Sequence, residues 1–136
     1  MESRKEETTM PKILIIDDDQ RIRMILRRIL LEGLGWSVVE ANNAKDGLNL
    51  YKTEQPDLVA LDLIMPGMSG DELLTEFHNA FGENLSPIVI ISSDSSRERL
   101  APLVKKGISG YILKPFTPHD VIERLREVYE KSKKKV

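Results

Sequence analysis

Short apolar runs alternate with amphipathic stretches along most of the chain. Five runs contain little but aliphatic and β-branched residues, and they occupy residues 13–16, 38–39, 58–61, 88–91 and 111–113. Continuous runs of this kind are typical of strands that are covered on both faces. Between the runs, apolar residues recur every three or four positions, which predicts helices. In the clearest of these helices the apolar stripe runs from residue 22 to residue 30, and four arginines, at positions 21, 23, 27 and 28, lie opposite it.

Helix start signals precede three of the predicted helices. They are a capping box at Ser69 and Glu72, a second at Ser95 and Glu98, and Thr117 followed by Pro118. The helix after Ser95 is the weakest, because Pro102 lacks an amide hydrogen and clashes with the preceding turn. We expect that helix to be kinked or to start late.

Strand and helix patterns alternate five times along the sequence. Right-handed crossovers then give an α/β fold, a doubly wound parallel sheet of five strands with helices on both faces. The length of 136 residues fits one domain, so no fused DNA-binding or catalytic module is expected. We expect residues 1–10 to be a disordered extension, residues 11–131 the folded domain and residues 132–136 a basic tail.

Composition excludes several classes of function. Twenty basic residues against 22 acidic ones give a net charge of −2, which points neither to nucleic acid nor to an anionic membrane. The chain has no cysteine and two histidines, so any bound metal must be held by oxygen. No apolar segment approaches the length of a membrane span or resembles a signal peptide. A cytoplasmic domain is therefore expected.

Carboxylates follow two of the predicted strands. Three aspartates at 17–19 come after the first strand, and Asp62 ends the third. In a sheet of order 2-1-3-4-5, the functional crevice lies between strands one and three, at their carboxyl ends. At least three carboxylates would meet there, and their repulsion favours a hard cation with oxygen ligands, best Mg²⁺.

A hydroxyl and an ammonium group are predicted at the same edge. Ser92 ends the fourth strand and Lys114 follows the fifth. A metal, a carboxylate, a hydroxyl donor and a cation around one pocket suit a transferring phosphoryl group, whose oxygens need neutralising from several sides. Each residue alone is commonplace in a turn, but four strand ends with one compatible chemistry indicate a site.

Four segments together resemble the receiver domain of two-component response regulators. They are IleLeuIleIleAspAspAsp at 13–19, LeuAspLeuIleMetProGlyMetSerGly at 61–70, IleValIleIleSerSer at 88–93 and SerGlyTyrIleLeuLysProPhe at 109–116. The resemblance covers residues 11–129, and within this family the chain is similar to stand-alone receivers of the chemotaxis-regulator type. It implies a flavodoxin-like fold with strand order 2-1-3-4-5.

The resemblance also implies an acceptor and a metal site. Asp62 would accept a phosphoryl group from a histidine kinase, a histidine phosphotransfer protein or a small phosphodonor. Asp18, Asp62 and the main-chain carbonyl of Ile64 would bind Mg²⁺ directly, and Asp17 largely through water. Asp19 would be a loop or capping residue.

The remaining implied roles concern the response to phosphorylation. Ser92 would donate its hydroxyl to the phosphoryl group, and Lys114, before a cis peptide bond to Pro115, would pair with another oxygen. Tyr111 would turn inward as a switch. A downstream effector protein would bind the changed surface, with the receiver a monomer or a phosphorylation-dependent dimer. Only self-phosphorylation and self-dephosphorylation are expected, so the protein is not predicted to be an enzyme.

Two alternatives remain open at this point. A magnesium-dependent phosphatase with an aspartyl-phosphate intermediate would also use a nucleophilic Asp, but a second carboxylate is expected two residues further on, where Ile64 stands. The other alternative is a scaffold receiver that binds partners independently of phosphorylation.

Overall fold

The computed structural model describes residues 10–94 and 96–134. The predicted disordered extension, Met10 excepted, and residues 135–136 of the predicted tail lie outside the described residues. The last helix continues through Lys134, so residues 132–134 of the predicted tail are helical.

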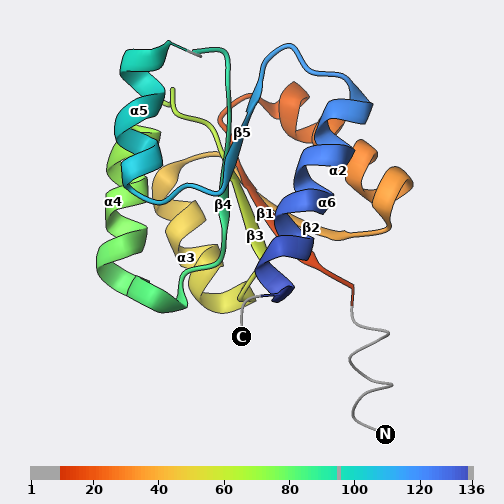
Figure 1. The fold of residues 1–136 in the computed structure, drawn as a ribbon, viewed down its shortest axis with the longest axis horizontal. Coiled ribbons are helices and arrows are strands. Elements are labelled where there is room, and N and C mark those ends of the chain that lie inside the picture. Colours follow the sequence, from red (N-terminus) through yellow and green to blue (C-terminus); the bar gives the residue numbers. More distant parts are fainter. Residues whose placement is uncertain (1–9, 95, 135–136) are drawn as a thin grey trace, which may run out of the picture.

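Five parallel strands form one sheet in the order β2-β1-β3-β4-β5, as predicted (Figure 1). The strands are β1 Lys12–Ile16, β2 Ser37–Ala41, β3 Leu58–Leu61, β4 Ile88–Ser92 and β5 Gly110–Leu113. The helices are α2 Gln20–Leu34, α3 Ala44–Glu54, α4 Gly70–Phe81, α5 Arg97–Lys105 and α6 Pro118–Lys134, with a short 3-10 helix η1 at Gly82–Asn84. Helices α2 and α6 lie on one side of the sheet, and α3, α4 and α5 lie on the other (Figure 1).

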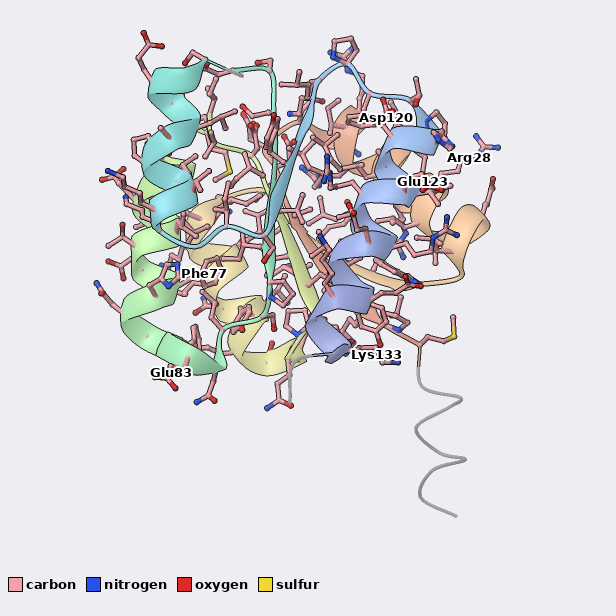
Figure 2. The ribbon with its side chains drawn as sticks, in the orientation of Figure 1. Arg28, Phe77, Glu83, Asp120, Glu123 and Lys133 are labelled. Carbon is pink, nitrogen blue, oxygen red and sulfur yellow. The ribbon has the colours of Figure 1, made fainter. Side chains whose placement is uncertain are left out.

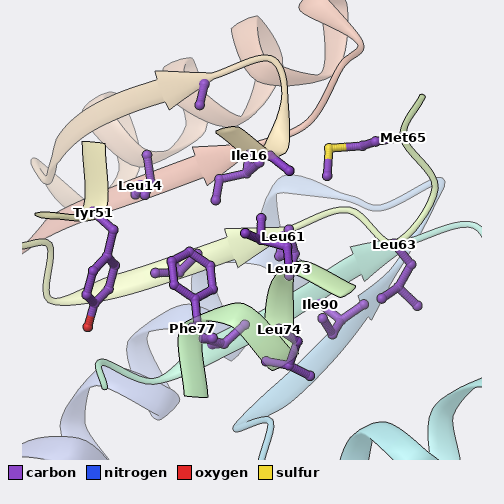
Figure 3. Packing of buried hydrophobic residues seen from close by; sticks show 14 of the residues in the cluster. Leu14, Ile16, Tyr51, Leu61, Leu63, Met65, Leu73, Leu74, Phe77 and Ile90 are labelled. Atoms are coloured by element: carbon purple, nitrogen blue, oxygen red, sulfur yellow. The ribbon is translucent and has the colours of Figure 1, made fainter. Parts of the chain in front are cut away.

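The side chains of alternate β1 residues pack into two separate hydrophobic layers, one on each face of the sheet. Ile13 and Ile15 pack with apolar residues of α2 and α6, whereas Leu14 and Ile16 pack on the side of α3 and α4. Figure 3 shows the second layer, in which Phe77 of α4 lies among the strand residues. Because both faces are covered, every residue of β3 and β4 is buried, which explains why these strands lack apolar–polar alternation in the sequence.

Two of the three predicted helix starts are confirmed. The capping box of Ser69 and Glu72 is present at α4, and Thr117 accepts a hydrogen bond from the Asp120 amide, 3.1 Å away, at the start of α6.

The third predicted start, at Ser95 and Glu98, is wrong by one residue. Helix α5 begins at Arg97 and its cap is Ser96, whose hydroxyl oxygen accepts from the Arg99 amide at 3.3 Å. The Asp94 carboxylate accepts from the Ser96 amide at 3.1 Å and turns the chain there, which moves the cap. Pro102 lies within this nine-residue helix and cannot donate to the carbonyl of Glu98.

Candidate functional site

The main-chain ladder brings two aspartates to adjacent positions at the carboxyl edge of the sheet. Asp17 directly follows β1 and donates its amide to the Ala41 carbonyl of β2 at 3.1 Å. Asp62 directly follows β3 and donates its amide to the Ile16 carbonyl of β1 at 3.0 Å. The pairing of β1 with β3 therefore continues past the strand ends and places both side chains at one rim, as the strand order predicts.

Three carboxylates gather at this rim. Asp17, Asp18 and Asp62 each offer one oxygen, and these oxygens lie within 4.8 Å of one another. Asp17 and Asp62 are buried, with 2% and 6% of their surface exposed, while Asp18 is exposed. Asp19 is not part of the cluster: its carboxylate accepts from the Arg21 amide at 2.9 Å and caps α2.

Lys114 supplies the counter-charge from the end of β5. Its ammonium nitrogen lies 2.8 Å from Asp17 Oδ2 and 3.4 Å from Asp62 Oδ2. The Lys114 amide donates to the Ser92 carbonyl at 3.0 Å, which extends the β4–β5 pairing and aims the residue at the rim. The Lys114–Pro115 peptide bond is cis, as expected. One ammonium against three carboxylates leaves the cluster with net negative charge.

The environment shifts the pKa of two of these groups. Burial raises the pKa of the Asp62 carboxyl, and the charge of Asp17 raises it further, against the opposing effects of Lys114 and of the Ile64 amide. Burial lowers the pKa of Lys114, but its hydrogen bond to Asp17 and the charges of both aspartates outweigh burial, so that this pKa lies above its ordinary value. Negative charge at Asp62 is therefore disfavoured by burial and by Asp17 and favoured by Lys114.

The loop after Asp62 is fixed by a close approach that the sequence did not reveal. The Ile64 amide donates to Asp62 Oδ1 at 3.2 Å, and the Gly70 amide donates to the Leu63 carbonyl at 3.0 Å. A Cβ atom on Gly70 would lie 2.5 Å from the Asp62 carbonyl oxygen and 2.6 Å from Leu63 Cα. The start of α4 can therefore rest against the Asp62 backbone only with glycine there. The sequence signal that could have indicated this close approach is the glycine at position 70, directly after the cap residue Ser69.

Ser92 and Tyr111 occupy different environments. Ser92 ends β4 beside the rim and is buried, and its hydroxyl oxygen accepts from the Asp94 amide at 3.3 Å, which leaves the hydroxyl hydrogen available for donation. Tyr111 of β5 lies at the surface with 44% of its area exposed. Ile64 is also exposed, at 55%, beside the rim.

Sequence reasoning also missed two residues behind the rim. Arg23 belongs to the arginine side of α2. In the structure its guanidinium donates to the main-chain carbonyl of Asp17 at 2.7 Å and pairs with Glu40 of β2 at 3.0 Å. Helical periodicity places Arg23 opposite the apolar stripe, but only the packing of β2 beside β1 brings Glu40 to it.

A comparison with known protein families identifies the family to which the chain with this site belongs. The sequence model of the response regulator receiver domain matches residues 13–126. The chain belongs to the response regulator receiver domain family. All four strand ends that carry the aspartates, Ser92 and Lys114 fall within the matched residues, so the prediction of a domain from two-component signalling is confirmed and the phosphatase alternative is not favoured.

Similar proteins agree with this assignment. The receiver domain is 34% identical over 121 residues to the response regulator MprA of Mycolicibacterium vanbaalenii, covering 89% of this chain and 51% of that protein. It is 35% identical to the probable transcriptional regulator ycf27 of Porphyridium aerugineum, covering 86% and 47% respectively. The chain thus spans about half the length of these curated relatives, and its predicted stand-alone character stays a prediction.

Solved structures match over nearly the full chain. A CheY-like receiver domain protein from Methanospirillum hungatei superimposes with a TM-score of 0.85 at 30% identity, covering 94% of this chain and all of that one. The chemotaxis protein CheY4 of Vibrio cholerae gives a TM-score of 0.82 at 26% identity, covering 88% of this chain and 99% of that one.

Among residues 10–94 and 96–134, none of the helices combines the length and apolar character that a membrane span requires.

Proposed function

We propose that this receiver domain accepts a phosphoryl group on Asp62 in a magnesium-dependent reaction and thereby changes a protein-binding surface. The observation that carries the proposal is the buried Asp62 carboxylate, which shares the Lys114 ammonium with Asp17 inside a cluster of three carboxylates. A carboxylate with a fixed cation beside it is equipped for nucleophilic attack on phosphorus.

The donor set fits magnesium. Three carboxylates with one ammonium leave uncompensated negative charge, and oxygen is the ligand that Mg²⁺ prefers. Asp18, Asp62 and the carbonyl of Ile64 would hold the ion, and Asp17, whose two oxygens already accept hydrogen bonds, would act through water. Bound there, Mg²⁺ supplies positive charge that neutralises the oxygens of the transferring group.

The transfer itself exchanges one bond to phosphorus for another. An Asp62 carboxylate oxygen attacks the phosphorus of a phosphohistidine, a P–O bond forms, and the P–N bond to the imidazole breaks with the electron pair going to nitrogen. Lys114 pairs with one phosphoryl oxygen, and the Ser92 hydroxyl donates to another. The Ser92 oxygen accepts from the Asp94 amide, so the hydroxyl hydrogen is available for this second bond.

The response is proposed to appear on the surface of α5, β5 and α6. Three apolar side chains are exposed there: Val104 at 61%, and Tyr111 and Leu113 at 44% each. Movement of Ser92 toward the phosphoryl group vacates space behind β4, and Tyr111 turns inward to fill it. The loss of an exposed aromatic ring changes the surface that an effector protein contacts.

The histidine-bearing partner is proposed to dock on α2 beside the rim. Arg21, Met24 and Arg28 are exposed on this helix, and Figure 2 shows Arg28 extending away from the ribbon. A groove of about 470 Å³ continues this face, and most of its lining is contributed by Ile25, Ile29, Phe116, Pro118 and Ile122. Mixed apolar and cationic character suits a helical histidine kinase or phosphotransfer protein that presents apolar and acidic residues.

The test is the intact mass of the protein after incubation with acetyl phosphate and Mg²⁺. A gain of one phosphoryl group is expected, and Asp62→Asn or a chelator should abolish it. Asp57→Asn is a matched control, because Asp57 precedes β3 at the opposite edge of the sheet and binds the Lys12 amide at 2.8 Å. That variant should be phosphorylated as the wild type is.

Other outcomes favour the alternatives. Rapid consumption of the donor without accumulation of phosphoprotein would support the phosphatase. No gain with any donor, together with a normally folded protein, would support a scaffold that binds partners independently of phosphorylation.

A further inference from the structure

We propose that Arg23, held by Glu40, is a positioning residue that sets the magnesium affinity of the site by fixing the backbone of Asp17. This inference rests on the proposed magnesium site and adds to it two residues outside the carboxylate cluster. Neither residue touches the phosphoryl group. They act through Asp17, at the turn between β1 and α2.

The geometry around Arg23 links three elements. From α2, its Nη1 donates to the Asp17 carbonyl oxygen at 2.7 Å, and its Nε donates to Glu40 Oε1 of β2 at 3.0 Å. The Arg23 side chain is 13% exposed and that of Glu40 25%, so this ion pair is shielded from solvent far more than those on the outer helix faces. A shielded pair with hydrogen-bond geometry fixes side-chain direction well.

Asp17 is held at every polar atom by these neighbours. Its amide donates to the Ala41 carbonyl, its Oδ1 accepts from the Asp19 amide at 2.9 Å, and its Oδ2 accepts from Lys114 at 2.8 Å. Arg23 takes the remaining group, the carbonyl. Without Arg23, a buried carbonyl loses a charged donor, and the peptide joining Asp17 to Asp18 loses its anchor to α2.

That peptide orients the one exposed carboxylate of the cluster. Asp18 follows it directly, so a rotation of the peptide moves the Asp18 carboxylate away from Asp62. The Arg23 guanidinium is paired with Glu40 and, among the described residues, does not contact the cluster carboxylates, so Arg23 serves as an anchor and Lys114 as the counter-charge. Removing Arg23 should therefore weaken metal binding through geometry. Outer-shell partners of metal ligands are worth about 10-fold or more in affinity.

Arg27 provides a matched control. It stands one turn further along α2 and pairs with the other oxygen of the same glutamate, its Nη1 lying 3.0 Å from Glu40 Oε2. Its side chain is 47% exposed, and its described hydrogen bonds do not include Asp17. Arg27→Gln thus removes the same charge from the same helix without freeing the Asp17 carbonyl.

The experiment is a calorimetric titration of the protein with Mg²⁺. As a second measurement, the rise of the urea unfolding midpoint is followed as the Mg²⁺ concentration increases. Arg23→Gln is expected to raise the Mg²⁺ dissociation constant about 10-fold, and Arg27→Gln less than about 2-fold. Arg23→Lys keeps one charged donor and should fall between wild type and Arg23→Gln. In acetyl phosphate labelling, the Mg²⁺ concentration for half-maximal rate should rise in Arg23→Gln, while the rate at saturating Mg²⁺ stays near that of wild type.

Equal dissociation constants for Arg23→Gln and Arg27→Gln would overturn the inference. So would a lower limiting rate with unchanged Mg²⁺ affinity. If Arg23→Gln does not fold, Glu40→Gln decides: it loosens the same anchor, and an increase of the dissociation constant by less than about 2-fold contradicts the inference. Failure of the proposed function looks different, because wild-type protein would then neither bind Mg²⁺ nor gain phosphate.

Discussion

Asp18→Asn is expected to stabilise the receiver domain in the absence of divalent cations. Asp17, Asp18 and Asp19 are neighbours in the unfolded chain as well, so their mutual repulsion largely cancels between the two states. The approach of Asp18 to Asp62, within 4.8 Å between ligand oxygens, is created only by folding. Two unit charges at that distance repel by about 1 kcal/mol in a water-like dielectric.

The expected gain is therefore ~1 kcal/mol in the free energy of unfolding. With an unfolding entropy of about 2 cal/mol/K per residue, and 136 residues, this corresponds to a rise of about 3–4 °C in Tm. Calorimetric melting in a chelator at low salt measures it. Glu76→Gln, on an exposed position of α4, removes one negative charge far from the rim and should leave Tm within about 1 °C.

Magnesium should reverse the order of the two proteins. Ligand binding stabilises by RT ln(1 + [Mg²⁺]/Kd), and the variant has lost one proposed ligand, so wild type gains more at each concentration. Two results would refute the reasoning. A variant less stable than wild type in the chelator would mean that repulsion is not the dominant effect at Asp18. A variant that keeps its advantage at every Mg²⁺ concentration would mean that Asp18 does not bind the ion.

Three further predictions concern the same rim. Gly70→Ala should destabilise by about 2–3 kcal/mol in urea unfolding, because its Cβ would meet backbone atoms at 2.5–2.6 Å; Gly67→Ala, with φ +81° and open space around it, should cost only about 1 kcal/mol. Asp62→Asn should stabilise the magnesium-free protein increasingly as the pH rises above 3.8 in urea unfolding, because a raised pKa in the folded protein means that ionised Asp62 costs stability there. Ser69→Ala should lower the free energy of unfolding by ~1 kcal/mol through loss of the capping box at α4.

Each of these three predictions has an outcome that would contradict it. Equal costs for the two glycine variants would show that the α4 start can move away from the Asp62 backbone. A stability difference between wild type and Asp62→Asn that does not grow with pH would contradict the raised pKa. An unchanged urea midpoint in Ser69→Ala would mean that water replaces the Ser69 hydroxyl at no cost.

The fold was readable from the sequence because its signals are local. Runs such as residues 58–61 and 88–91 are continuous and apolar, which is typical of strands buried on both faces, and the stripe of α2 follows the helical period. The start of α5 was misplaced by one residue because adjacent serines at 95 and 96 offer the same cap. The choice depends on where the Asp94 carboxylate turns the chain, as its bond to the Ser96 amide shows.

The sequence by itself determined the element order, the two-sided sheet and the residue types at each strand end. Asp17, Asp62, Ser92 and Lys114 were predictable because parallel strands deliver their carboxyl ends to one edge. These inferences need only the period of the side chains and the handedness of the connections, and both are properties of short segments.

Only the tertiary structure decided how the rim is supported. Gly70 matters because α4 approaches the Asp62 backbone, and Arg23 matters because β2 lies beside β1 and presents Glu40 to it. The hydrogen bond of 2.7 Å from Arg23 to the Asp17 carbonyl involves an arginine that the helical pattern places opposite the apolar stripe. Such contacts depend on the packing of elements that are distant in sequence, and no local period encodes that packing.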